Sequence, residues 1–202
     1  MRSKIFVLAI VGLAAAGLTA AIAQDTKAAP QMTAEQQAEM ATYMKYATPG
    51  QAHALLKPFV GSFNVTSTMW QAPGTPPEVS KGTSENTWVL GERWVQQHFK
   101  GEVMGMPFEG IGFTGYDNFK KKYVGTWIDS MSTMLMVSTG TADASGKTFT
   151  ATGTVDDVVT GKPATFREAT KVIDANTHVM EMFGADKTGK EFKMMEIVYT
   201  RK

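Results

Sequence analysis

A succession of strand-like runs from Gly61 to the C-terminus is the feature that most constrains how this chain folds. Phe63, Val65, Ser67 and Met69 alternate with the period of a half-buried strand. About ten strands are expected, near Gly61–Gln71, Val79–Leu90, Arg93–Glu102, Pro107–Tyr116, Lys122–Asp129, Thr133–Ala142, Lys147–Val155, Ala164–Ile173, His178–Gly184 and Lys190–Arg201. Tight turns between them indicate an antiparallel meander, and closure removes both edges of such a sheet. We therefore predict an all-β fold: an antiparallel up-and-down β-barrel with one or two short N-terminal helices.

The first 23 residues have the pattern of a secretory signal peptide. A short basic region precedes an apolar run at residues 5–18, and Ala21-Ile22-Ala23 supplies a small-x-small cleavage pattern ahead of Gln24. A membrane anchor would need roughly 20 apolar residues, which this run does not reach. The chain contains no cysteine, whereas small secreted eukaryotic domains usually carry disulfides. We therefore expect a periplasmic or secreted bacterial protein that is not embedded in the membrane after cleavage.

The mature chain is expected to comprise a leader, residues 24–48, and a single β-barrel domain, residues 49–202. The leader contains a helical pattern at residues 33–46, where Thr33 opens a capping box. A second short helix is expected to follow it, capped by Thr48, immediately before the first strand. The barrel domain would then carry a short helix at one of its mouths.

Composition excludes several classes of function. The formal charge is only +1, so no basic excess draws the chain to nucleic acid. The absence of cysteine excludes disulfides, thiol catalysis and zinc–cysteine sites. A transmembrane barrel is disfavoured because the strands carry too many charged residues for a continuous apolar belt. A soluble barrel of this size has room for one small ligand.

Aromatic side chains on successive predicted strands give the best indication of a pocket. Tryptophan and tyrosine bury a large area while keeping one polar atom, which suits a small-molecule site. Plain barrel core is the alternative interpretation. The candidate ligand-binding residues are Trp88, Trp94, Tyr116, Tyr123, Trp127, Asp129 and Arg167.

Three carboxylates lie between apolar or hydroxyl-bearing neighbours on their strands: Glu168, Glu181 and Glu196. Each faces either the solvent, in a cross-strand ion pair, or the barrel lumen. A lumen carboxylate would need a hydroxyl or an arginine as a partner, because an unpaired buried charge is very costly.

Metal and cofactor chemistry has weak support, and we predict no metal and no cofactor. The three histidines lie in different elements without metal-ligand spacing. A haem would need only one axial ligand, and His98 is the best placed for it. Methionine pairs such as Met134-x-Met136 and Met180-x-Met182 could bind Cu(I), but flexible core filling is the simpler explanation.

Several runs resemble known families. Gly61-Ser62-Phe63 on the first strand, with Arg201 on the last, resembles the calycin signature, with Phe63 in place of its tryptophan. Longer runs resemble the bacterial domain-of-unknown-function family 1579: Leu55-Leu56-Lys57-Pro58-Phe59-Val60-Gly61, Phe108 to Asp117, Tyr123 to Met131 and Met194 to Thr200. The resemblance covers roughly residues 49–202. It implies a lipocalin-like barrel and brings no established activity or catalytic residue.

The leading hypothesis is a secreted lipocalin-like protein that binds a small apolar or amphipathic ligand in the barrel. The alternative is a structural or interaction barrel with a self-filled interior, which could form a homodimer. No nucleophile, base and oxyanion site assemble in the sequence, so we do not expect an enzyme. The volume of the inward side chains discriminates between the first two hypotheses.

Overall fold

Residues 32–202 are described in a computed structural model, and the predicted signal peptide lies outside them. The described residues form two helices, a short 3₁₀ helix and ten strands. These are α1 Ala34–Ala47, α2 Gln51–Ala54, η1 Lys57–Phe59, β1 Gly61–Met69, β2 Glu78–Val89, β3 Trp94–Val103, β4 Met106–Asp117, β5 Lys122–Asp129, β6 Met136–Ala142, β7 Thr148–Asp157, β8 Lys162–Val172, β9 Thr177–Ala185 and β10 Glu191–Arg201.

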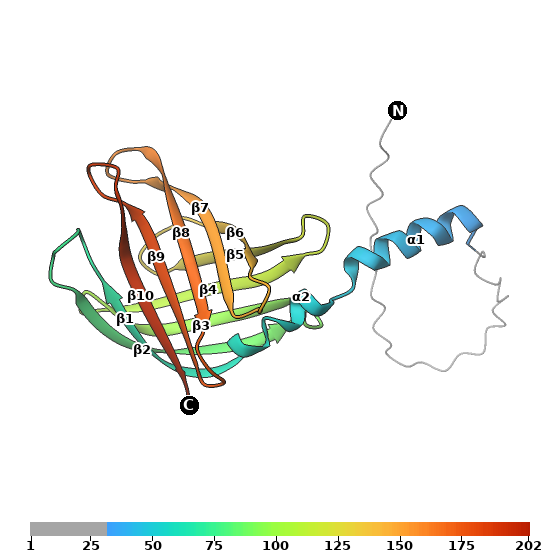
Figure 1. Ribbon diagram of the computed structural model, residues 1–202, viewed down its shortest axis with the longest axis horizontal. Coiled ribbons are helices and arrows are strands. Elements are labelled where there is room, and N and C mark those ends of the chain that lie inside the picture. The colour runs from blue at the N-terminus through green and yellow to red at the C-terminus, as the bar shows by residue number, and fades with distance from the viewer. Residues whose placement is uncertain (1–31) are drawn as a thin grey trace, which may run out of the picture.

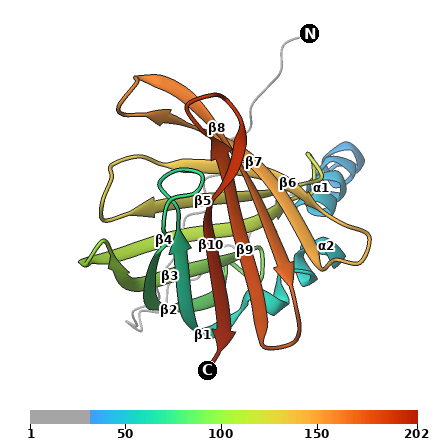
Figure 2. The ribbon, with the colours of Figure 1, turned by 60° about the vertical axis from the view of Figure 1, so that its left-hand side comes forward.

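The ten strands close into one antiparallel barrel in which each strand pairs with its sequence neighbours and β1 pairs with β10. This confirms the predicted fold class. In Figure 1 the strands β6 to β10 cross the strands β1 to β5 at a steep angle, and Figure 2 shows the walls wrapping around the interior. Strand β6 begins later than predicted, at Met136, because Asp129 and Ser132 hold residues 130–135 in a loop through bonds to the amides of Met131 and Met134.

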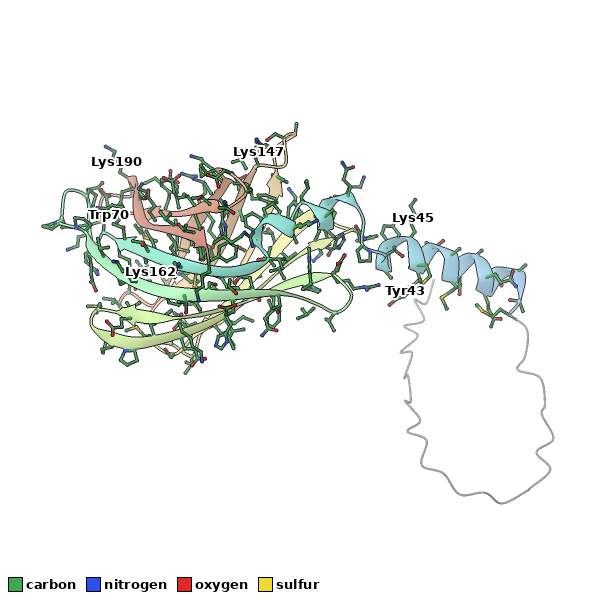
Figure 3. The ribbon with its side chains drawn as sticks, turned by 90° about the horizontal axis from the view of Figure 1, so that it is seen from below. Tyr43, Lys45, Trp70, Lys147, Lys162 and Lys190 are labelled. Atoms are coloured by element: carbon green, nitrogen blue, oxygen red, sulfur yellow. The ribbon has the colours of Figure 1, made fainter. Side chains whose placement is uncertain are left out.

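The two ends of the barrel differ. We call the end that carries α2 and η1 the closed end; Figure 1 shows α2 there. The opposite end, formed by residues 70–77, 104–105, 130–135, 158–161 and 186–190, carries no helix of the described residues, and we call it the open end. In Figure 3, Trp70 and Lys190 lie at the open end, whereas Lys147 lies toward the closed end.

Helix α1 begins with a complete capping box between Thr33 and Gln36 and buries none of its residues. It projects away from the barrel, as Tyr43 and Lys45 show in Figure 3. Thr48 is the C-cap of α1 and not the N-cap of α2, which is Gly50. The prediction of a cap at Thr48 was therefore wrong, because the Thr48 hydroxyl donates back to the Met44 carbonyl, at 2.7 Å.

The arginine of the last strand ties the closed end together. Arg201 donates to the carbonyls of Val60 and Pro58, at 2.8 and 3.1 Å, and its guanidinium lies 4.8 Å from the centroid of the Phe63 ring. Gly61 has a φ of +134°, and any Cβ there would collide with that guanidinium. The Gly61, Phe63 and Arg201 set therefore acts as one packing unit between the first and last strands.

Candidate functional site

The closed end of the lumen is filled by an apolar cluster. Leu56, only 1% exposed, packs with Val95 and Tyr123. Half-buried residues surround these three: Ala52, Phe59, Val60, Trp88, Tyr116, Ala142 and Phe149. The Tyr123 hydroxyl donates to the carbonyl of Ala52, at 2.9 Å. This cluster therefore fills much of the closed end of the lumen.

A chain of polar side chains crosses the interior next to this cluster. Asn86 donates to the Phe59 carbonyl, at 2.8 Å, and accepts from Ser84, at 2.7 Å. Gln97 donates to both the Ser84 and Tyr199 hydroxyl oxygens, at 3.2 and 3.0 Å. Such a buried network is stable because its members satisfy one another.

Tyr199 joins this polar chain to an aromatic stack. Its ring is parallel to that of His178, with centroids 4.4 Å apart and an interplanar angle of 11°. Burial, opposed by the hydrogen bond from Gln97 and aided by the neighbouring Glu168, raises the pKa of Tyr199 to about 12. Burial lowers the pKa of His178 to about 4, with a smaller contribution from Arg201. Both side chains are therefore neutral near pH 7.

Of the three carboxylates Glu168, Glu181 and Glu196, Glu168 is the one that the fold turns inward. Its strand position pairs with Ala151, and its Oε2 accepts a hydrogen bond from Ser138 Oγ, at 3.0 Å. Burial raises the pKa of Glu168, and the bond from Ser138 opposes that rise. The other carboxyl oxygen, Oε1, has no hydrogen-bond partner in the protein. Every fully buried side-chain oxygen of the described residues has such a partner, so Oε1 is not fully buried. Oε1 therefore adjoins space that a water-sized group can reach.

Small residues form the part of the wall that includes Ser138, although Phe166 packs over Gly153 and the Ser138 hydroxyl lies over Gly125. Strand pairing aligns Thr114, Gly125, Ser138 and Gly153 in one row across β4 to β7. Thr114 faces inward, since it pairs with the buried Val95, and yet its side chain is exposed. An inward side chain stays exposed only where the lumen beside it is not filled.

The apolar half of the site lies toward the open end. Trp127, Phe108, Met180 and Ile197 are half-buried around the core of Phe63, Val65, Phe99 and Tyr199. Phe108 stacks on Trp127 with centroids 6.4 Å apart and an interplanar angle of 18°. Trp127 Nε1 donates to Asp129 Oδ2, at 3.1 Å, which fixes the indole ring.

The structure separates the residues predicted from the sequence. Trp127 and Asp129 face the lumen, whereas Trp88, Tyr116 and Tyr123 belong to the closed-end cluster. Trp94 and Arg167 do not line the pocket, which corrects the prediction for both. Trp94 lies over Gly115 on the outer face, because its neighbour Val95 points inward. Arg167 forms a two-bonded pair with Glu191 and lies 3.9 Å from the Phe183 ring centroid.

The remaining charged candidates also lie outside. Glu181 and Glu196 both pair with Lys193, at 3.2 and 2.5 Å, as solvent-side ion pairs. His98 pairs with Glu109 on the outer face, so it is not placed to ligate a haem in the lumen. Within residues 32–202 no group of three His, Asp or Glu is arranged to hold a metal ion.

A shallow hollow of about 950 Å³ lies at the closed end, and its lining includes Leu55, Trp88, Lys147, Ile173 and Arg201. It is open to solvent, and the Arg201 guanidinium beside it already donates to backbone carbonyls. We therefore place the candidate site in the lumen around Glu168, Ser138, Tyr199 and Trp127.

The fold and this interior define the class of protein: a closed ten-stranded up-and-down β-barrel with a polar cluster in an apolar lumen. The family model "Protein of unknown function (DUF1579)" matches residues 48–201, and the chain belongs to that family.

One solved structure supports the fold. A crystal structure of Rv2717c from M. tuberculosis is similar with a TM-score of 0.57 and 11% sequence identity, covering 77% of this chain and 99% of that one. A redesigned β-barrel matches with a TM-score of 0.37 and 12% identity, covering 75% and 96%. No curated protein matches the chain. No helix among residues 32–202 is long and apolar enough to cross a membrane.

Proposed function

We propose that this protein binds a small amphipathic molecule inside its barrel and acts as a carrier in the bacterial periplasm or outside the cell. The observation that carries the proposal is the interior position of Glu168. Its carboxyl accepts one bond from Ser138 and leaves Oε1 beside accessible space. Placing a carboxyl there costs stability unless a partner occupies that space.

The lining supports a ligand with one polar end. Its apolar part would lie against Trp127, Phe108, Met180 and Ile197, and its polar end would reach Glu168. Small-molecule pockets typically combine an apolar lining with a few convergent polar groups. The exposed inward side chain of Thr114 favours this function over a self-filled barrel.

Binding fits the site better than catalysis. The interior acid Glu168 has a hydroxyl neighbour in Ser138, but that hydroxyl donates to the acid itself and is not activated by a histidine. His178 stacks on Tyr199 and has no hydrogen-bonded partner among the described residues. These contacts do not supply the nucleophile, base and oxyanion donors that a hydrolytic site requires.

Tryptophan fluorescence tests the proposal. The full chain is expressed from its own start codon in a bacterial host and titrated with the neutral apolar dye N-phenyl-1-naphthylamine. We expect saturable binding with energy transfer from Trp127. Trp127→Phe should remove most of that transfer, whereas Trp94→Phe, a matched change on the outer face, should preserve it. Equal effects of the two variants, or no saturable binding, would count against a lumen site.

Native mass spectrometry of the same preparation tests both the bound ligand and the cellular location. A stoichiometric extra mass that disappears on denaturation would reveal a copurified ligand. Periplasmic recovery of a chain that begins at Gln24 would support secretion. Recovery of the uncleaved chain from the cytoplasm would refute it.

A further inference from the structure

We propose that the head group of the ligand is a cation with N–H donors, of the primary alkylammonium class, held by Glu168. This inference rests on the proposed binding function and specifies its chemistry. It follows from the charges that the strands turn into the lumen.

The lumen between the two ends is acidic. Strand pairing places four carboxyls on the inward face, those of Glu78, Asp129, Asp157 and Glu168. It also places one lysine there, Lys162, which pairs with Asp157 at the open end. Of these five residues, only Glu168 lies away from the end of its strand. Arg201 is at the closed end, where its guanidinium bonds backbone carbonyls. The interior histidine, His178, is neutral above about pH 4.

The inward carboxyls differ in what they can still accept. Glu78 accepts from the Met104 amide, and Asp157 accepts from the amides of Val159 and Thr160. Asp129 already accepts from Trp127 Nε1 and from the Met131 amide, at 3.1 and 3.0 Å. Glu168 accepts only from Ser138, at 3.0 Å, so Oε1 remains free for a donor on the ligand. Because Glu168 also lies deeper, it is the group that selects the head group.

Three head-group classes would meet this site differently. A carboxylate ligand would approach Glu168 with like charge, and Glu168 has no basic partner among residues 32–202 to compensate it. An alcohol could donate one neutral hydrogen bond. A primary ammonium donates a charge-assisted hydrogen bond, which is shorter and roughly twice as strong as a neutral one. The apolar surroundings of Glu168 in the lumen also strengthen the attraction between its carboxylate and an ammonium group.

A matched ligand series tests the inference. Dodecylammonium, dodecanol and dodecanoate share one chain length and differ in the head group. Their dissociation constants are measured with the full chain at pH 7.5 by displacement of N-phenyl-1-naphthylamine, below the concentration at which each surfactant forms micelles. We expect dodecylammonium to bind at least about tenfold tighter than dodecanoate, with dodecanol in between.

Variants locate the preference. Glu168→Gln keeps the shape and removes the charge, so it should weaken dodecylammonium binding about tenfold and change dodecanol binding by less than about threefold. Glu181→Gln, the same change on the outer face, should leave the whole series unchanged. Circular dichroism checks the folding of both variants, and the wild-type series tests the inference without either of them.

The outcomes are distinguishable. Ammonium preference that is lost in Glu168→Gln supports the inference. Equal binding of the three ligands, or tighter binding of dodecanoate, overturns the cation assignment while leaving the lumen-binding function standing. Failure of all three ligands and of the dye to bind overturns both.

Discussion

The buried imidazole of His178 should make the stability of the barrel depend on pH. Its ring is 5% exposed, stacks on Tyr199 and meets the edges of Phe59 and Phe63. Burial, with a smaller contribution from Arg201, lowers its pKa from 6.5 to about 4. The perturbation that we propose is His178→Phe, which keeps an aromatic ring and removes the titrating group. No hydrogen bond of the described residues is lost with it.

The sign follows from proton binding. Between pH 6.5 and about 4 the unfolded chain takes up a proton at His178 that the folded chain excludes. The stability that the neutral His178 contributes to the folded state is therefore fully present above pH 6.5 and is lost as the pH falls toward 4. At 1.36 kcal/mol per pKa unit, the whole loss amounts to about 3 kcal/mol. Between pH 7.5 and 5.5, where most carboxylates stay ionised, it should be about 1 kcal/mol.

Urea denaturation at 25 °C, followed by circular dichroism, measures the free energy of unfolding at pH 7.5, 6.5 and 5.5. The wild type should lose about 1 kcal/mol more than His178→Phe across this range. Trp94→Phe, a packing change on the outer face, should keep the wild-type slope. If the free energy of unfolding falls equally with pH in the wild type and in His178→Phe, then the folded protein accepts a proton on His178. That result would refute the argument from burial.

Three further changes test the packing and the lumen. Arg201→Met removes the bonds to three carbonyls and the contact with an aromatic ring, so urea denaturation should show a loss of about 2–4 kcal/mol in the free energy of unfolding. A loss below about 1 kcal/mol would refute the proposed role of Arg201 in joining the first and last strands. Gly110→Ala places a Cβ against the Trp127 ring and should cost about 1–3 kcal/mol with a changed tryptophan emission, and unchanged emission would contradict that contact. Thr114→Trp should fill the lumen and abolish dye binding, whereas Thr152→Trp, on the outer face of β7, should preserve it. Binding that survives Thr114→Trp would place the site elsewhere.

The predicted architecture agrees closely with the structure because its signals are local. Turn residues and strand-like runs fix where strands begin and end, and the observed bounds mostly differ from the predicted ones by a few residues. The Thr33 and Gln36 capping box forms as the sequence indicates. The short helix was harder to place, because Thr48 can cap either the end of one helix or the start of the next.

The site could be predicted only in part. The sequence placed Trp127 and Asp129 on one strand face, and the structure turns that face inward. Glu168 carried a usable signal, its position between Phe166 and Thr170, but Glu181 and Glu196 carried a similar one and lie outside. Nothing local marks Ser138, which lies 30 residues from the carboxyl to which it donates.

The sequence by itself determined the strand order, the turns and the all-β class, because the alternation of side chains and the chemistry of turns act over a few neighbouring residues. Only the tertiary structure decided which face of each strand is inside. On β10 a register shift between Lys193 and Met195 helps to place Ile197 and Tyr199 inward and Glu196 outward. A period of two defines two faces for every strand, and closure of the barrel selects between them through the pairing of distant strands. The acidic lumen exists because that selection turned Glu168 in and the neighbouring Arg167 out.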